Sequence, residues 1–274
     1  MQLRPFLPLV AVLLAGCSSP DEVREKTGVT ATASQSASRA GASASAAASA
    51  NGSAKKVAED TDLYSYAFSY PAPVGRYPAL AARLEQQAAK ARAEMIAQAR
   101  EERESAKKEG FPFHPHSYGA EWKVVADLPG YLSLSNEFST YTGGAHGMYG
   151  LESLVWDKEA ERAMDGAELF TSPQALGAAM GGTVCAALNR ERENRRGEPV
   201  DPKGEYFSDC PGLDSATILV GSSNGKTFDR ITVWFGPYVA GPYAEGAYEL
   251  DFPMTAAMLG AVKPAYREAF GAKS

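Results

Sequence analysis

The sequence has few of the residues that build metal sites and nucleophilic centres. Three cysteines and three histidines occur among 274 residues, and neither a Cys-x-x-Cys nor a His-x-x-x-His pattern is present. Structural zinc usually takes four cysteine or histidine ligands that are spaced a few residues apart. A zinc site is therefore a weak hypothesis, and we expect neither a metal nor another cofactor.

Positive charge is also in the minority. The chain has 27 lysines and arginines against 33 acidic residues, which gives a formal net charge of −6. Phosphate backbones and anionic lipid headgroups attract basic surfaces. We therefore expect no nucleic-acid partner, and an acidic protein outside the cytoplasm would sooner meet a cationic one.

The N-terminus carries a short apolar run that resembles a bacterial lipoprotein signal. The run from Phe6 to Leu14 follows Arg4 and ends in Leu-Ala-Gly-Cys at 14–17. It is too short to span a bilayer, and it is typical of a cleaved signal peptide. The lipobox resemblance implies a signal peptide over 1–16 and a lipid on Cys17. The chain would then be anchored in the cell membrane or outer membrane, facing the periplasm or the exterior. An ordinary signal with a coincidental cysteine is the alternative.

Residues 17–60 are rich in alanine, serine, glycine and threonine. Such a composition cannot bury a core, so we expect a disordered tether there. Lipidation of Cys17 would leave Cys185 and Cys210 as an even pair in an oxidising compartment. The sequence therefore predicts a disulfide between these two.

The remaining chain predicts an α+β fold with mixed or antiparallel sheets, one long helix and one medium helix. Pro78 begins the long helix and Gly110 ends it, whereas Pro173 and Gly197 bound the medium one. Alternating or apolar runs predict strands at 63–70, 121–128, 131–141, 151–157, 216–220, 227–235 and 247–252. Short helical turns are expected after Pro253 and Pro264. Because strand, helix and strands occur twice in order, two related or interleaved halves are compatible with the pattern.

Two segments resemble an extracytoplasmic domain family. Residues 138–147, Phe-Ser-Thr-Tyr-Thr-Gly-Gly-Ala-His-Gly, are similar to the Phe-x-x-Tyr-x-Gly-Gly-Ala-His signature of DUF4163 and DUF3298 domains. Residues 237–246 resemble the family's second segment. The likeness divides the folded part into a DUF4163-like region, 61–160, and a DUF3298-like region, 161–274. The candidate binding residues are Tyr141, Gly143, Gly144, His146, Tyr238, Tyr243 and Glu245.

This RsiV/PdaC-like resemblance implies a non-catalytic binding or sensing module of the cell envelope. Its members include a lysozyme-sensing domain and the non-catalytic part of a peptidoglycan deacetylase. The implied partners are peptidoglycan fragments or a cationic lysozyme-like protein. Several motif residues allow two interpretations. His146 either shapes its loop or contacts a partner, and Glu245 is either a buried acceptor or an exposed contact. The tyrosines suit a core or a sugar-stacking surface.

An envelope glycan hydrolase or deacetylase-type enzyme is the alternative function. Residues 221–225 match Gly-x-Ser-x-Gly, but a strand rather than a helix is predicted after them. All three histidines precede Ser223, whereas in α/β-hydrolases the catalytic histidine follows the serine. A deacetylase would need a Thr-Phe-Asp-Asp-Gly motif, of which 227–229 is only a fragment. A metal site of His114, His116 and His146 is disfavoured by the prolines around the first two.

Overall fold

The computed structural model describes residues 52–272 except 202 and 205. The expected signal peptide, 1–16, and Cys17 lie outside the described residues. No helix in the described part is both long and apolar enough to cross a membrane.

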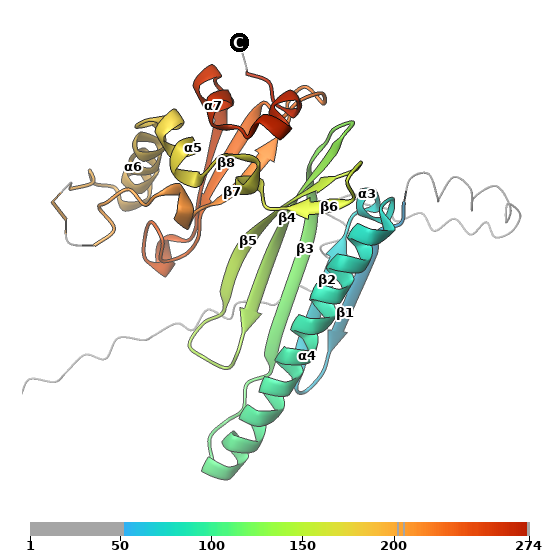
Figure 1. The fold of residues 1–274 in the computed structure, drawn as a ribbon. Helices are drawn as coiled ribbons and strands as arrows, with labels where there is room; N and C mark the ends of the chain where they lie inside the picture. The colour runs from blue at the N-terminus through green and yellow to red at the C-terminus, as the bar shows by residue number, and fades with distance from the viewer. Residues whose placement is uncertain (1–51, 202, 205, 273–274) are drawn as a thin grey trace, which may run out of the picture. The chain divides into compact units, whose positions relative to one another are not determined.

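The first half of the fold is a mixed six-stranded sheet in sequential strand order (Figure 1). The β2–β3 pair is parallel and the other pairs are antiparallel. The strands are β1 (Lys55–Asp60), β2 (Tyr64–Tyr70), β3 (His116–Asp127), β4 (Tyr131–Tyr141), β5 (Met148–Asp157) and β6 (Arg162–Met164). The sheet thus continues past the expected division at residue 160.

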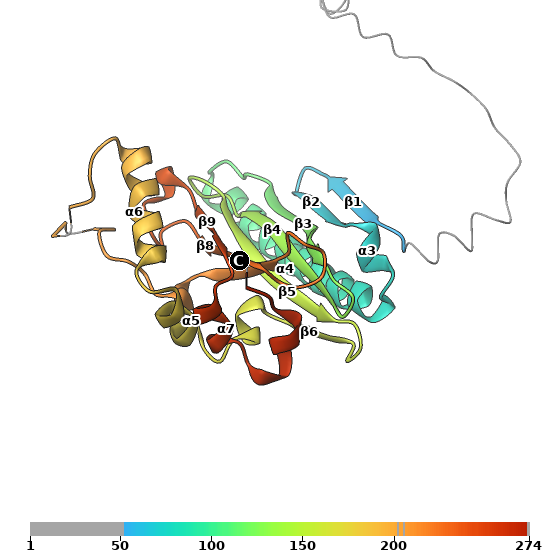
Figure 2. The ribbon, with the colours of Figure 1, turned by 90° about the horizontal axis from the view of Figure 1, so that it is seen from above.

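The long helix α4 (Pro78–Glu109) follows the short helix α3 (Ala72–Gly75) and connects the two parallel strands. Pro78 stands in its first turn, and Gly110 ends it in a left-handed conformation with φ 78°. An apolar stripe of Leu80, Leu84, Ala88, Met95 and Ala99 is buried. It packs on one face of the sheet (Figures 1 and 2), against a cluster that includes Tyr66, Phe68, Trp122 and Leu134.

The second half contains a three-stranded antiparallel sheet and smaller helices. Its strands are β7 (Thr217–Gly221), β8 (Arg230–Phe235) and β9 (Tyr248–Pro253). Its α-helices are α5 (Pro173–Met180), α6 (Thr183–Arg196) and α7 (Ala256–Ala261). The 3-10 helices are η1 (Gly166–Leu169), η2 (Leu213–Ser215), η3 (Tyr243–Glu245) and η4 (Pro264–Ala269). Apolar residues of α5, α6, β7 and β8 form one core with residues of the first sheet, among them Ala126, Val155 and Met164.

Three expectations on the fold need correction. The tether does not reach residue 60, because 55–60 form strand β1 at the edge of the first sheet. The medium helix is two helices, since Gly181 adopts φ 59° and ψ −144° and interrupts the chain between α5 and α6. Strand β3 begins earlier than predicted, at His116. The α+β class, the long helix and the other strands are confirmed.

The second half covers only part of the sheet face opposite α4. Thr217 in β7 donates a hydrogen bond to the carbonyl of Leu151 in β5 at 2.8 Å, and this contact joins the two sheets. At one end of the first sheet, Ala126 of β3 and Val155 of β5 belong to the core of the second half. Toward the other end, residues of β1–β5 line an open groove, which is described below with the site.

Candidate functional site

The two motif segments meet in space, although His146 and Tyr238 are 92 residues apart in the sequence. The loop between β4 and β5 carries His146, and the segment between β8 and β9 carries Tyr238 and Tyr243. The His146 and Tyr243 rings stack with centroids 4.0 Å apart and planes inclined by 25°. Tyr149 completes the cluster through an edge-to-face contact with Tyr243 at 6.0 Å. We call His146, Tyr149, Tyr238 and Tyr243 the aromatic corner.

Hydrogen bonds fix the orientation of the His146 ring. Its Nδ1 lies 2.8 Å from the carbonyl oxygen of Gly147, and its Nε2 lies 3.3 Å from the Tyr238 hydroxyl. A carbonyl only accepts, so Nδ1 carries the proton, and Nε2 accepts from the tyrosine. The Tyr243 hydroxyl donates to the same Gly147 carbonyl at 2.7 Å. The loop and the β8–β9 segment are thus held together by polar contacts as well as by stacking.

The corner is exposed, and one of its residues is strained. Tyr238 is 50% exposed and Tyr149 is 37% exposed. Tyr238 also adopts φ 68°, a left-handed conformation that costs a bulky residue about 1–3 kcal/mol. Such strain persists only where surrounding structure imposes it, and it concentrates at functional sites. The geometry therefore holds a large aromatic side chain at the surface against its own backbone preference.

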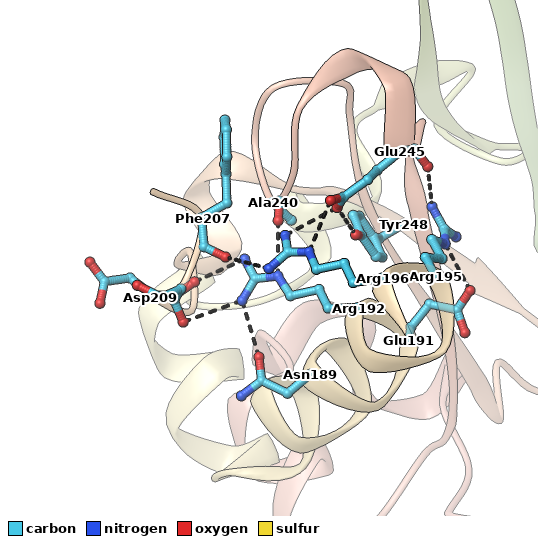
Figure 3. A network of polar contacts seen from close by, with 11 residues as sticks. Asn189, Glu191, Arg192, Arg195, Arg196, Phe207, Asp209, Ala240, Glu245 and Tyr248 are labelled. Atoms are coloured by element: carbon cyan, nitrogen blue, oxygen red, sulfur yellow. Dashed lines mark hydrogen bonds and ion pairs between the residues drawn. The ribbon is translucent and has the colours of Figure 1, made fainter. Parts of the chain in front are cut away.

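Glu245 does not belong to the exposed corner, although the sequence placed it beside Tyr243. Its carboxylate accepts two hydrogen bonds from Arg196, at 2.9 and 3.1 Å, and a further one from the Tyr248 hydroxyl (Figure 3). Its side chain is 17% exposed. Burial alone would raise the pKa of Glu245, but the bonds from Arg196 and Tyr248 outweigh it and lower that pKa. Glu245 therefore positions the β8–β9 segment rather than offering a free carboxylate.

Arg192 of α6 is fully buried and anchors the same β8–β9 segment. It donates to the carbonyls of Ala240 at 2.9 Å and Asp209 at 3.0 Å, and to the Asn189 side chain at 3.1 Å (Figure 3). Burial lowers the pKa of this guanidinium, and the nearby Arg196 charge acts in the same direction. The sequence predicted a helix in this region but did not reveal that the arginines of α6 hold the segment that carries the corner.

The disulfide expected from the sequence is present next to this network. Cys185 of α6 is bonded to Cys210, with 5.5 Å between their Cα atoms. Asp209, whose carbonyl accepts from Arg192, directly precedes Cys210. The disulfide therefore fixes the position of the backbone at Asp209, which accepts a hydrogen bond from the buried Arg192.

The two motif glycines and Tyr141 lie beside the corner rather than in it. Gly143 adopts φ 82°, and a Cβ there would come within 2.3 Å of a Glu102 carboxylate oxygen. The other Glu102 oxygen lies 2.6 Å from Nε2 of the buried His116. The positive φ favours glycine at position 143, beside the Glu102 side chain of α4, whereas Gly144 is exposed to solvent. Tyr141 ends β4 and pairs with Ser117.

The alternative catalytic sets do not assemble in the described part of the chain. The Ser223 hydroxyl donates to Asp229 at 2.6 Å within the tight connection between β7 and β8. That connection is a hairpin rather than a strand-to-helix elbow. No group of three His, Cys, Asp or Glu residues among the described positions could hold a metal ion.

A groove that sequence reasoning missed adjoins the corner. Its volume is about 640 Å³, and its lining comes from β1–β5 together with Trp234 of β8 and Glu249 of β9. Tyr149 belongs to both the groove and the corner. The small residues Ala58, Ala67 and Gly119 are the only sequence feature that could have indicated the groove. They lie far apart in the sequence, and only the strand register shows that they are neighbours.

Comparison with protein families identifies the segment that contains the first motif. The model of the family described as Deacetylase PdaC matches residues 57–149, from β1 to the start of β5. Residues 57–149 are therefore similar to the PdaC family, over about a third of the chain. The match confirms the PdaC-like resemblance for this segment. The Gly-Gly-Ala-His loop lies at the end of the matched segment, and the three-stranded sheet follows it in the sequence.

Two solved structures of bacterial proteins are similar to this chain. A DUF3298 family member from Bacteroides fragilis has 18% identity and a TM-score of 0.45, over 74% of this chain and 91% of its own. A DUF3298 family protein from Pseudomonas aeruginosa has 16% identity and a TM-score of 0.43, over 81% of this chain and 98% of its own. No curated protein matches the chain.

Proposed function

We propose that this chain is a lipid-anchored protein of the bacterial cell envelope whose folded part binds without chemical turnover. Its partner is a peptidoglycan fragment or a cationic lysozyme-like protein. The observation that carries the proposal is the exposed aromatic corner, in which both family motifs converge. Aromatic side chains that combine an apolar ring with a polar tip are enriched at binding surfaces.

Two further features support binding over catalysis. The net charge of −6 favours a cationic partner through electrostatic steering. The family that matches residues 57–149 is described as a deacetylase, yet no group of three metal-ligand residues gathers in the described part of this chain. His146 makes contacts within the corner through both of its ring nitrogens, as a residue that supports the shape of a binding surface would.

The lipid anchor rests on the sequence around Cys17. Replacing Cys17 by serine should move the protein from the membrane fraction to the soluble fraction of the cell envelope. A processed Cys17→Ser protein that stayed in the membrane fraction would refute lipid anchoring, while the binding proposal would stand.

Binding is tested with Tyr238→Gly in pull-downs on insoluble peptidoglycan and on immobilised lysozyme. Glycine accepts φ 68° without strain, and this relief offsets the loss of the Tyr238 contacts with His146 and Tyr243, so the melting temperature should stay close to that of the wild type. The substitution removes the exposed ring, and retention should fall at least tenfold. Tyr206→Gly is the matched control, because Tyr206 is 78% exposed and is not one of the residues of the aromatic corner.

Two outcomes would contradict the proposal. Equal retention of wild type and Tyr238→Gly would show that the corner does not contact the partner. Release of reducing ends or acetate from purified peptidoglycan, abolished by His146→Ala, would show that the domain is an enzyme. Binding of lysozyme should also weaken as ionic strength rises, because salt screens charge steering.

A further inference from the structure

The open groove has a floor of small side chains that crosses four strands. Ala58, Ala67, Gly119 and Ser139 occupy register-matched positions on β1, β2, β3 and β4. Side chains alternate between the faces of a strand, so this row lies opposite the face that α4 covers. Tyr149 of β5 continues the row. At about 4.8 Å between strands, the row from β1 to β5 is about 19 Å long.

A second row along the same face carries hydrogen-bonding groups. Glu121 and Glu137 face each other directly across β3 and β4. Like charges in that position destabilise a sheet. Lys123 offsets the repulsion by bonding Glu137 at 2.8 Å and Glu121 at 3.4 Å. The structure therefore maintains two carboxylates side by side at an uncovered surface, where they can accept hydrogen bonds.

An aromatic wall borders these rows. Trp234 of β8 lines the groove, and its ring lies against the backbone of Gly236, where a Cβ would come within 3.0 Å of a ring carbon. This packing restricts the motion of the Trp234 ring. Trp234 and Tyr149 are thus two aromatic side chains beside the row of small residues and the row of carboxylates.

Most of the charge around the groove is balanced. The charged residues of the lining are Lys56, Glu121, Glu137 and Glu249. Lys123 lies outside the lining but is paired with Glu121 and Glu137, so these five side chains together carry a net charge of −1. A polyanion would gain little from such a surface, and a strongly cationic chain would meet two lysines. A polar but uncharged ligand is the best electrostatic match, since its hydroxyl groups can donate to the carboxylates while its apolar faces contact the aromatic rings.

We propose that this groove binds an uncharged oligosaccharide, which lies across strands β1–β5 between the small-residue floor and Trp234. The inference deepens the proposed function and rests on it for the binding role. It assigns the glycan to the groove, whereas the aromatic corner is tested separately.

The test uses the purified full chain and chitohexaose as the probe. Titration should change the tryptophan fluorescence, because Trp234 lines the groove while Trp122 and Trp156 are only 6% and 3% exposed. The change should disappear in Trp234→Phe. Calorimetry should show that Ala67→Phe, which fills the exposed floor, weakens chitohexaose binding at least tenfold.

The control is Ala89→Phe, the same substitution at an exposed position of α4, which lies on the other side of the sheet. It should bind chitohexaose as wild type does. Melting temperatures identify a variant that fails to fold, and the wild-type fluorescence titration keeps the proposal testable in that case. Polygalacturonate, a polyanion, should not bind.

Three results would overturn the assignment. These are no binding of chitohexaose to wild type, equal binding to wild type and Ala67→Phe, and binding of poly-L-lysine in place of chitohexaose. If chitohexaose fails while retention on peptidoglycan or lysozyme persists and depends on Tyr238, only the glycan groove is refuted. If wild type binds none of the probes, the proposed function fails as well.

Discussion

Replacing Glu245 by glutamine should destabilise the fold by about 3 kcal/mol at pH 7. The variant keeps the shape of the side chain but loses the charge that accepts two bonds from Arg196 and one from Tyr248. Hydrogen bonds to charged groups contribute about 1.5–3 kcal/mol each, and the neutral amide retains part of them. The substitution would also remove a negative charge that interacts favourably with both Arg192 and Arg196.

Urea unfolding followed by circular dichroism measures this loss. With an m-value of about 3 kcal/mol/M, the midpoint should fall by about 1 M. Glu191→Gln is the matched control. Glu191 forms a more exposed i,i+4 pair with Arg195, and such pairs contribute about 0.5 kcal/mol. Equal midpoints for the two variants would refute the structural role of Glu245.

The pH dependence supplies an independent check. The folded-state pKa of Glu245 lies below its ordinary value of 4.5. A lowered carboxyl pKa stabilises the folded state above the unfolded-state pKa, and this contribution is lost as pH falls through the folded-state pKa. The difference between wild type and Glu245→Gln should therefore be constant from pH 7 to about 5.5 and shrink below the ordinary value. A difference that stays constant down to pH 3 would contradict the assignment.

Two further predictions concern covalent and edge-strand stabilisation. Replacing Cys185 and Cys210 by serine should lower the free energy of unfolding by about 3 kcal/mol in urea denaturation, because the bridge closes a loop of 25 residues; two alkylatable thiols in unreduced wild type would contradict the bridge. Deleting residues 55–60 removes β1 with its half-buried Val57, and calorimetry should show a melting temperature lower by about 5 °C; an unchanged melting temperature would mean that β1 contributes nothing to the sheet.

Local signals in the sequence account well for the elements whose ends they mark. Pro78 and Gly110 bound α4 because proline suits the first helical turn and glycine accepts the left-handed cap. Strand β1 escaped prediction because Lys55–Asp60 contains one apolar β-branched residue among charged ones, and pairing with β2 decides its structure. The break at Gly181 was not predicted, because Leu176, Met180, Val184 and Leu188 keep a helical spacing across it.

The site was predictable only as separate pieces. The family resemblance selected both motifs, but nothing in the sequence shows that His146 meets Tyr243 in a stack. The role of Glu245 stayed open because its partner, Arg196, lies 49 residues away on another element. The groove could not be predicted for a similar reason. Ala67 and Gly119 are neighbours only because β2 and β3 pair in parallel in this register.

The corner and the groove share a boundary but have different supports, and this makes their functions separable. Tyr149 contributes to both, and its hydroxyl accepts from the Ala247 backbone at the end of the β8–β9 segment. That segment is held by Arg192, which in turn bonds the chain beside the disulfide. The groove floor instead depends on the pairing of β1–β4. A weakened α6 should therefore disturb the corner before the floor, so loss of the disulfide should reduce binding that requires Tyr238 more than it reduces chitohexaose binding.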